Sequence, residues 1–155
     1  MTEIASGGLF ALQVQSLLTY INAYLGSPAV TGPGDLLDPD QQFQYLASTL
    51  QIYNPANNLC LDDGGNELLD LTSQGPSAIV SFKDCDSSSI NQQFIFTTGN
   101  QIINPNWPNP SNCLNGGGMN PNSYQALILW SCIPSLSNQI FNIIPICSPG
   151  SSNCL

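Results

Sequence analysis

The stretch TLQIYNPANNLCLDDGG, residues 49–65, decides the fold because the chain repeats its pattern as NQIINPNWPNPSNCLNGGG, residues 100–118. Both stretches hold an alternating apolar run, Asn-Pro, a polar turn, Cys-Leu and a run of glycines. A second shared block follows each of them, AIVSFKDCDSSSINQQF at 78–94 and ALILWSCIPSLSNQIF at 126–141. Corresponding residues recur after about 50 positions, which is typical of a structural repeat.

A shorter first copy without cysteine precedes these two. ALQVQS at 11–16 corresponds to TLQIYN at 49–54, DQQF at 40–43 to NQQF at 91–94, and PAVTG at 28–32 to the strands AIV and ALI. Period-two apolar runs between Pro, Gly and Asn clusters predict strands. The alternative for residues 9–25 is a helix, because their apolar side chains also fall at helical spacing. The repeat favours strands.

Three copies of about four short strands predict an all-β closed barrel with pseudo-threefold symmetry, because no copy buries its apolar face alone. Phe43, Phe94 and Phe141 end the copies and are expected at equivalent core positions. We predict one domain over residues 1–155, with repeats at about 9–45, 46–97 and 98–144 and a tail at 145–155.

Composition excludes several classes of function. Charged residues make up 7% of the chain, Lys83 is the only base, and the formal net charge is −9. Nucleic acids and anionic membranes both require several Lys or Arg, so neither is an expected partner. No stretch is long and apolar enough to span a bilayer. Histidine is absent, which removes the commonest general base and metal ligand. We therefore expect neither an enzyme, nor a cofactor, nor a metal.

Six cysteines in a chain so poor in charge predict three disulfides and a secreted, extracellular protein. The start, MTEIASGG, has no basic region like that of a secretion signal. We expect that such a signal has been removed or that the chain is not the complete precursor.

The two cysteine-containing copies resemble the ricin-type β-trefoil lectins. The resemblance is carried by Cys60-Leu61-Asp62, Cys85 and Gln92-x-Phe94, which recur as Cys113-Leu114-Asn115, Trp130-x-Cys132 and Gln139-x-Phe141. It covers residues 46–143 well and 9–45 loosely. The family has three copies, each with a Gln-x-Trp (or Phe) signature and, typically, a disulfide of its own. It implies a β-trefoil with a degenerate first repeat and the pairs Cys60–Cys85 and Cys113–Cys132, which leave Cys147 to pair with Cys154.

The resemblance also implies a carbohydrate site. A pyranose stacks its apolar face on an aromatic ring and offers an edge of hydroxyls to donors and acceptors. In the third repeat Trp130 matches the family's stacking residue, Asn138 the hydroxyl partner and Gln139 its neighbour. Asn115 stands where the family has Asp, and an amide lacks the charge assistance of a carboxylate. This repeat is the expected main glycan site.

The second repeat is the expected weaker site. Asp62, Asn91 and Gln92 match the family, but Lys83 occupies the stacking position. Phe82 beside it is expected to point inward, because side chains alternate along a strand. The first repeat has neither the Asp nor the cysteines, so no site is expected there.

Three minor features receive simpler interpretations. DLLDPD at 35–40 and DDGGNE at 62–67 carry enough oxygens for calcium, but neither has the spacing of a known loop, so solvated turns are favoured. Asp84 and Asp86 share one strand face without a sign of the raised pKa that a glycosidase acid needs. Trp107 lies in a Pro-rich segment that excludes helix.

The alternative function is structural. A sparsely charged chain with an apolar N-terminal run and a cysteine-bearing tail is compatible with a subunit of an extracellular filament or other assembly of identical copies. A head-to-tail contact that does not close produces such a fibre.

Overall fold

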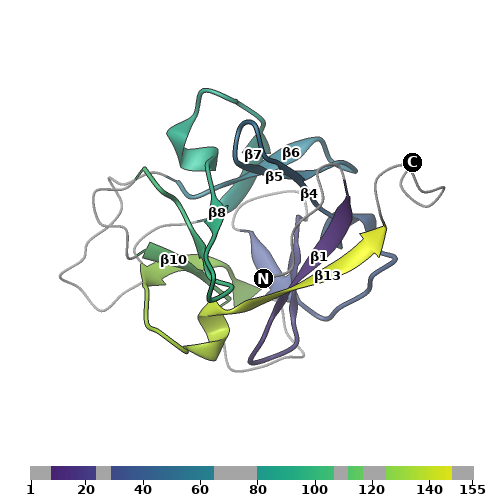
Figure 1. Ribbon diagram of the computed structural model, residues 1–155. Coiled ribbons are helices and arrows are strands. Elements are labelled where there is room, and N and C mark those ends of the chain that lie inside the picture. The colour runs from purple at the N-terminus through teal and green to yellow at the C-terminus, as the bar shows by residue number, and fades with distance from the viewer. Residues whose placement is uncertain (1–7, 24–28, 65–79, 107–111, 117–124, 148–155) are drawn as a thin grey trace.

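The end of the described chain pairs with its beginning. The protein's structure is a computed structural model, described for residues 8–23, 29–64, 80–106, 112–116 and 125–147. Strand β1 (Leu9–Val14) runs antiparallel to β13 (Phe141–Cys147), and the two lie side by side in purple and yellow in Figure 1. Residues 9–14 therefore form a strand, and the helical alternative for 9–25 is wrong. Tertiary pairing across the whole chain outweighs the local helical spacing.

The described residues form three antiparallel sheets, with strand orders β11-β3-β2-β1-β13, β4-β5-β6-β7 and β12-β10-β9-β8. Three short 3₁₀ helices, η1 (Pro39–Gln41), η3 (Ile90–Gln92) and η4 (Ser137–Gln139), precede the three equivalent phenylalanines. The remaining strands are β2 (Tyr20–Asn22), β3 (Val30–Gly32), β4 (Gln44–Leu46), β5 (Gln51–Asn54), β6 (Leu59–Asp62), β7 (Ser81–Asp84), β8 (Ile95–Phe96), β9 (Ile102–Ile103), β10 (Asn112–Asn115), β11 (Gln125–Ala126) and β12 (Ile128–Ser131).

Equivalent backbone hydrogen bonds relate the three repeats. The amides of Phe43, Phe94 and Phe141 donate to the carbonyls of Phe10, Leu50 and Asn100 respectively, at 2.8, 2.8 and 3.0 Å. Phe10 is thus the counterpart of Leu50, whereas the sequence match assigned that place to Leu12. The match of ALQVQS to TLQIYN was therefore wrong by two residues. A shift of two keeps the same side chains on the same face, so the apolar pattern alone does not detect it.

Backbone hydrogen bonds also connect the first repeat to each of the other two. The Ala29 amide donates to the Val80 carbonyl at 2.7 Å, and the Leu127 amide donates to the Ala29 carbonyl at 2.8 Å. Each of these residues is at most 1% exposed. The all-β trefoil expected from three mutually dependent copies is confirmed by this arrangement.

The core is built from equivalent side chains of all three repeats. Phe43 and Phe94 are fully buried and Phe141 is 1% exposed, as their recurrence predicted. Each contributes about 2–3 kcal/mol from removal of apolar surface from water. Phe43 stacks on Phe82 with ring centroids 5.7 Å apart, which places the inward-facing Phe82 against another repeat.

Disulfides join the two strands that frame the second and third repeats. Cys60 bonds to Cys85 and Cys113 to Cys132, as predicted. The predicted pair Cys147–Cys154 is not covered, because Cys154 belongs to the undescribed tail. Trp107 also lies outside the described residues.

The first repeat replaces the disulfide with a tyrosine packed on a glycine. Tyr20 lies opposite Gly32 in the strand pairing, as Cys60 lies opposite Lys83. The Pro33 carbonyl accepts a hydrogen bond from the signature glutamine of its repeat, as the residues before Cys85 and Cys132 do in theirs. Gly34, which follows Pro33, therefore occupies the position of those two cysteines. A Cβ on Gly34 would lie 2.2 Å from two carbons of the Tyr20 ring, so only glycine fits beneath the ring.

The acidic loop at 35–40 is a capped turn. The Asp35 and Asp38 carboxylates accept hydrogen bonds from the amides of Leu37 and Asp40, at 2.9 and 3.0 Å. Among the residues that the structure describes, no group of three or more His, Cys, Asp or Glu is arranged to hold a metal ion. Within the same ranges, no helix has the length and apolarity needed to cross a membrane.

Candidate functional site

Two hairpin-like ladders present equivalent outward faces in the second and third repeats. In the second, Cys60 lies opposite Lys83 and Asp62 opposite Ser81. In the third, Cys113 lies opposite Trp130 and Asn115 opposite Ile128. The alternate residues point inward: Leu61, Phe82, Leu114 and Leu129 are at most 6% exposed. Lys83 and Asp62 therefore share one face, as Trp130 and Asn115 do.

The signature glutamines fix the loop beside each ladder. The Gln92 side chain accepts from the Asp86 amide at 2.9 Å and donates to the Asp84 carbonyl at 3.0 Å. Gln139 does the same with the Ile133 amide and the Ser131 carbonyl, both at 2.9 Å. Gln41 makes the same two bonds in the first repeat, with Asp35 and Pro33. All three glutamines are at most 2% exposed. We call this buried amide, with its two hydrogen bonds to the loop backbone, the loop clamp. It is present in the first repeat as well, where no site is expected.

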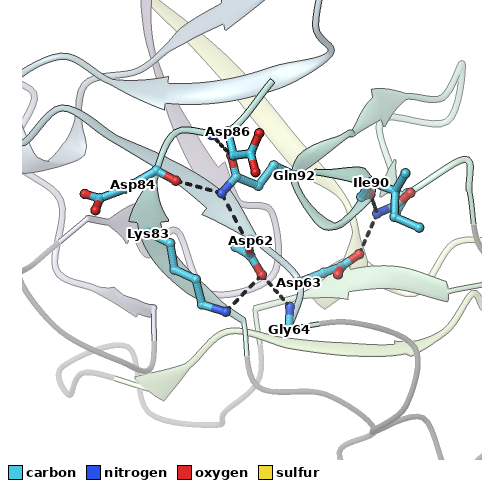
Figure 2. A network of polar contacts seen from close by, with 9 residues as sticks. Asp62, Asp63, Gly64, Lys83, Asp84, Asp86, Ile90 and Gln92 are labelled. Carbon is cyan, nitrogen blue, oxygen red and sulfur yellow. Dashed lines mark hydrogen bonds and ion pairs between the residues drawn. The ribbon is translucent and has the colours of Figure 1, made fainter. Parts of the chain in front are cut away.

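Asp62 is the centre of a polar network in the second repeat (Figure 2). Its Oδ1 accepts from the Gly64 amide at 2.9 Å and lies 3.4 Å from Lys83 Nζ. Its Oδ2 accepts from Gln92 Nε2 at 3.3 Å. The Asp62 side chain is 5% exposed, while that of Lys83 is 54% exposed. The carboxylate is thus held in place by two neutral donors and one exposed ammonium group.

A second network ties the same loop to the third repeat. Asn104 Nδ2 donates to Asp63 Oδ2 and to the Ile90 carbonyl, both at 2.7 Å. Asn54 makes the matching contacts one repeat earlier, to the carbonyls of Pro39 and Gln42 at 2.9 Å. The Asn of each Asn-Pro motif therefore joins its repeat to the 3₁₀ helix of the preceding one. This is a structural role that accounts for the recurrence of Asn-Pro.

A cavity of about 740 Å³ lies over the outward face of the second repeat. It is wide open to solvent, so it is a shallow surface depression rather than an enclosed pocket. Apolar and polar side chains share its lining, which consists of Leu59, Asp62, Phe82, Lys83, Asp84, Asp86, Ser89 and Gln92. The predicted Asp62 and Gln92 both line it, whereas the predicted Asn91 does not.

The carboxylates at the mouth of this cavity are exposed. Hydrogen bonds from the Ser88 hydroxyl and the Ser88 amide lower the pKa of Asp86 below its ordinary value. Asp84 is likewise exposed. A glycosidase acid requires the opposite shift, a raised pKa in an apolar slot. The geometry therefore does not favour hydrolysis by this pair.

The third repeat brings together three of its four predicted site residues on one side of the barrel. Trp130 is half-buried on β12 and lies on the face that Asn115 occupies. Asn138 Nδ2 donates to Asn115 Oδ1 at 3.2 Å. Asn138 Oδ1 is buried and has no hydrogen-bond partner. Gln139, the fourth, lies behind them as the loop clamp, with its amide bonded to backbone.

The first repeat lacks the side chains of such a site. Gly32 occupies the position of Lys83 and Trp130, and Asn22 that of Asp62 and Asn115. Sequence reasoning did not find Leu59, Ser89 or Asp86 as part of the second-repeat cavity. Their only sequence signal is proximity to the disulfide, because the loop that carries Asp86 and Ser89 takes its position from hydrogen bonds to the Gln92 side chain.

Comparisons with known proteins identify the fold. No protein-family model matches the chain, and no curated protein matches it significantly. Among solved structures, a non-toxic homologue of type II RIPs from bitter gourd (Momordica charantia), in complex with α-methyl-D-galactoside, is 17% identical with a TM-score of 0.65. That match covers 88% of this chain and 47% of the other, so this chain spans about half of the bitter gourd protein.

Two further structures match over nearly their whole length. The C-terminal domain of an earthworm lectin, a mutant in complex with 6'-sialyllactose, is 14% identical with a TM-score of 0.65, covering 89% of this chain and 98% of the other. The designed threefold-symmetric protein ThreeFoil is 13% identical with a TM-score of 0.65, covering 88% and 98%. This chain is therefore a β-trefoil similar in fold to ricin-type lectin domains.

Proposed function

We propose that the chain is a non-enzymatic, lectin-like carbohydrate-binding module whose main site is the outward face of the third repeat. The observation that carries the proposal is that a half-buried indole, Trp130, shares a strand face with Asn115, which is hydrogen-bonded to Asn138. Trp130 would stack on the apolar face of a pyranose while the two amides bind its hydroxyls. Gln139 supports the loop that carries Asn138.

The spacing of these groups suits one sugar ring. Trp130 on β12 lies opposite Cys113 on β10, and Asn115 follows Cys113 by two residues on β10. Trp130 and Asn115 are therefore diagonal neighbours across the two strands. Diagonal side chains lie about 7–8 Å apart at Cβ, within reach of long or aromatic groups. The equivalent diagonal pair in the second repeat, Lys83 and Asp62, does make contact at 3.4 Å.

Asn138 adds a second argument. A buried carbonyl oxygen without a hydrogen-bond partner is rare, and such groups are often found at functional sites. Asn138 Oδ1 is such an oxygen, next to the Asn115 amide. Because this oxygen is buried, a sugar hydroxyl can donate to it only if the Asn138 amide turns outward on binding, which would then remove the cost of leaving it unpaired.

The comparisons support the same class of ligand. Two of the matching structures hold a sugar, α-methyl-D-galactoside in one and 6'-sialyllactose in the other. The disulfides that close the second and third repeats are compatible with an oxidising environment, so we place the protein outside the cytoplasm as part of this proposal.

A glycan array tests the proposal with wild type, Trp130→Ala and Trp130→Phe. Loss of the indole is expected to lower affinity by about tenfold or more, because stacking on an aromatic ring is worth about 1.4 kcal/mol. The Phe variant keeps a ring and is expected to lose less. The proposal fails if the wild type binds no glycan, or if Trp130→Ala binds as well as wild type.

The alternative, a subunit of an extracellular assembly of identical copies, depends on the chain ends. Residues 1–7 and 148–155 lie outside the described part of the chain, and no described feature favours this function over glycan binding. Sedimentation of the dilute protein tests it, since a stable monomer would contradict it.

A further inference from the structure

One position differs decisively among the three repeats. The residues opposite Tyr20, Cys60 and Cys113 are Gly32, Lys83 and Trp130. All three lie at the same place in the ladder and point to the same side. This position decides whether the outward face of a repeat carries a ring, a charge or no side chain.

In the second repeat the lysine engages the residue that a sugar would need. Lys83 Nζ lies 3.4 Å from Asp62 Oδ1, and the Gly64 amide donates to the same oxygen at 2.9 Å. Gln92 Nε2 donates to the other oxygen at 3.3 Å. As Figure 2 shows, these donors converge on Asp62 and the lysine chain extends along the face next to it. A sugar hydroxyl must compete with an ammonium group that belongs to the protein.

The second-repeat cavity is otherwise suited to a pyranose. It has a volume of about 740 Å³, an apolar contribution from Leu59, and a carboxylate in its lining that is 5% exposed. The missing element is a flat apolar surface, since Phe82 is buried under the strand and stacks on Phe43. The loop clamp from Gln92 is complete, so the backbone of the pocket is built as in the third repeat.

We infer that, among the repeat faces that the structure describes, only that of the third repeat binds glycans, and that Lys83 is the residue that keeps the second repeat closed. This inference rests on the proposed function of the third repeat. It specifies the valence of the protein: a chain with one sugar site attaches to a glycan-coated surface but does not cross-link two such surfaces. Replacing Lys83 with tryptophan removes the ammonium from Asp62 and supplies the ring, and so opens a second site.

The test compares wild type, Trp130→Ala, Lys83→Trp and the double variant Trp130→Ala/Lys83→Trp on a glycan array. Beads coated with the glycan best bound on that array then report cross-linking. The wild type is expected to bind without aggregating the beads, and Lys83→Trp to aggregate them. The double variant is expected to regain binding to within about tenfold of wild type, because one well-made stacking contact is worth about that factor.

Two controls show whether the variants fold and whether the regained glycan binding uses the second-repeat cavity. Lys83 is exposed, so its replacement is expected to leave the circular dichroism spectrum and the thermal midpoint close to wild type. Adding Asp62→Ala to the double variant removes the hydrogen-bond acceptor, and the folded triple variant is expected to lose the regained binding. Binding that survives Asp62→Ala in the folded protein overturns the inference, because the gain would then not use this pocket.

The outcomes separate the inference from the proposed function. If wild type binds and the folded double variant does not, the role of Lys83 is overturned while the third-repeat site stands. If wild type does not bind and the double variant does, the proposed function fails while the closure of the second repeat by Lys83 is supported. Aggregation of beads by monomeric wild type overturns the single-site inference.

Discussion

Replacing Gly34 with alanine is expected to destabilise the protein through a single contact in the first repeat. The added Cβ would lie 2.2 Å from Tyr20 Cδ2 and Cε2 and 3.1 Å from Cζ. Carbon atoms in contact normally lie about 3.5–4.0 Å apart, so the ring has to move by more than 1 Å. The Tyr20 hydroxyl accepts from Gln13 Nε2 at 3.0 Å, and Gln13 Oε1 accepts from Asn142 Nδ2 at 3.1 Å. Movement of the ring therefore disturbs the contacts where β1 meets β13.

The magnitude follows from three contributions. Overpacking costs about 1–3 kcal/mol, and loss of the Gln13–Tyr20 hydrogen bond adds about 1 kcal/mol. Alanine restricts the unfolded chain more than glycine does, which offsets about 0.4–1 kcal/mol. The net loss is about 1–3.5 kcal/mol in the free energy of unfolding. Urea unfolding followed by circular dichroism measures it as a fall of about 1 M in the midpoint.

Gly99→Ala is the matched control. A Cβ there meets only Thr97 Oγ1, at 3.9 Å, so the change in the free energy of unfolding is expected within about 0.5 kcal/mol. A second control places Gly34→Ala in a Tyr20→Ala background, where the clash is absent and little further loss is expected. The reasoning is refuted if Gly34→Ala is as stable as Gly99→Ala, or if it costs as much without the Tyr20 ring as with it.

Two further changes test the scaffold. Replacing both Cys60 and Cys85 with alanine removes a disulfide that closes a loop of 25 residues, and a loss of about 3.5 kcal/mol is expected in chemical denaturation; a loss below about 1 kcal/mol would show that the bond does not restrict the unfolded chain. Leu18 has a φ of 56° and is 62% exposed, whereas Asn58 occupies the equivalent turn with a φ of 53°. Leu18→Gly is expected to raise stability by about 1 kcal/mol by relieving the left-handed conformation, measured as a higher thermal midpoint, and an unchanged or lower midpoint would contradict this.

The similarity between repeats in sequence and their difference at the position of Lys83 have a common origin. The Asn-Pro motif, the signature glutamine and the terminal phenylalanine recur because they build the barrel: Asn104 joins repeats, Gln92 clamps a loop and Phe94 fills the core. Lys83 is exposed and does none of these tasks. Its position is therefore free to differ between repeats, and under the proposed function it decides which repeat carries a binding face.

The amino-acid sequence by itself determined the strands, the repeat and the cysteine-bearing ladders. These follow from local rules: alternation every two residues places Phe82 inside and Lys83 outside, and the recurrence of the cysteines about 50 residues apart sets the copies in register. The family resemblance named the disulfide pairs Cys60–Cys85 and Cys113–Cys132 and the set Trp130, Asn138, Gln139 and Asn115, of which Gln139 is buried behind the other three.

Only the tertiary structure decided how these parts meet. It showed that Phe10 rather than Leu12 is the counterpart of Leu50, and that the signature glutamines are buried clamps. It also showed that Tyr20 on Gly34 replaces a disulfide and that Lys83 reaches Asp62. The contacts of Tyr20 with Gly34 and of Lys83 with Asp62 join residues that are well separated along the chain. Their geometry depends on strand register and loop positions fixed only when the three repeats close on one another, so no local pattern encodes it.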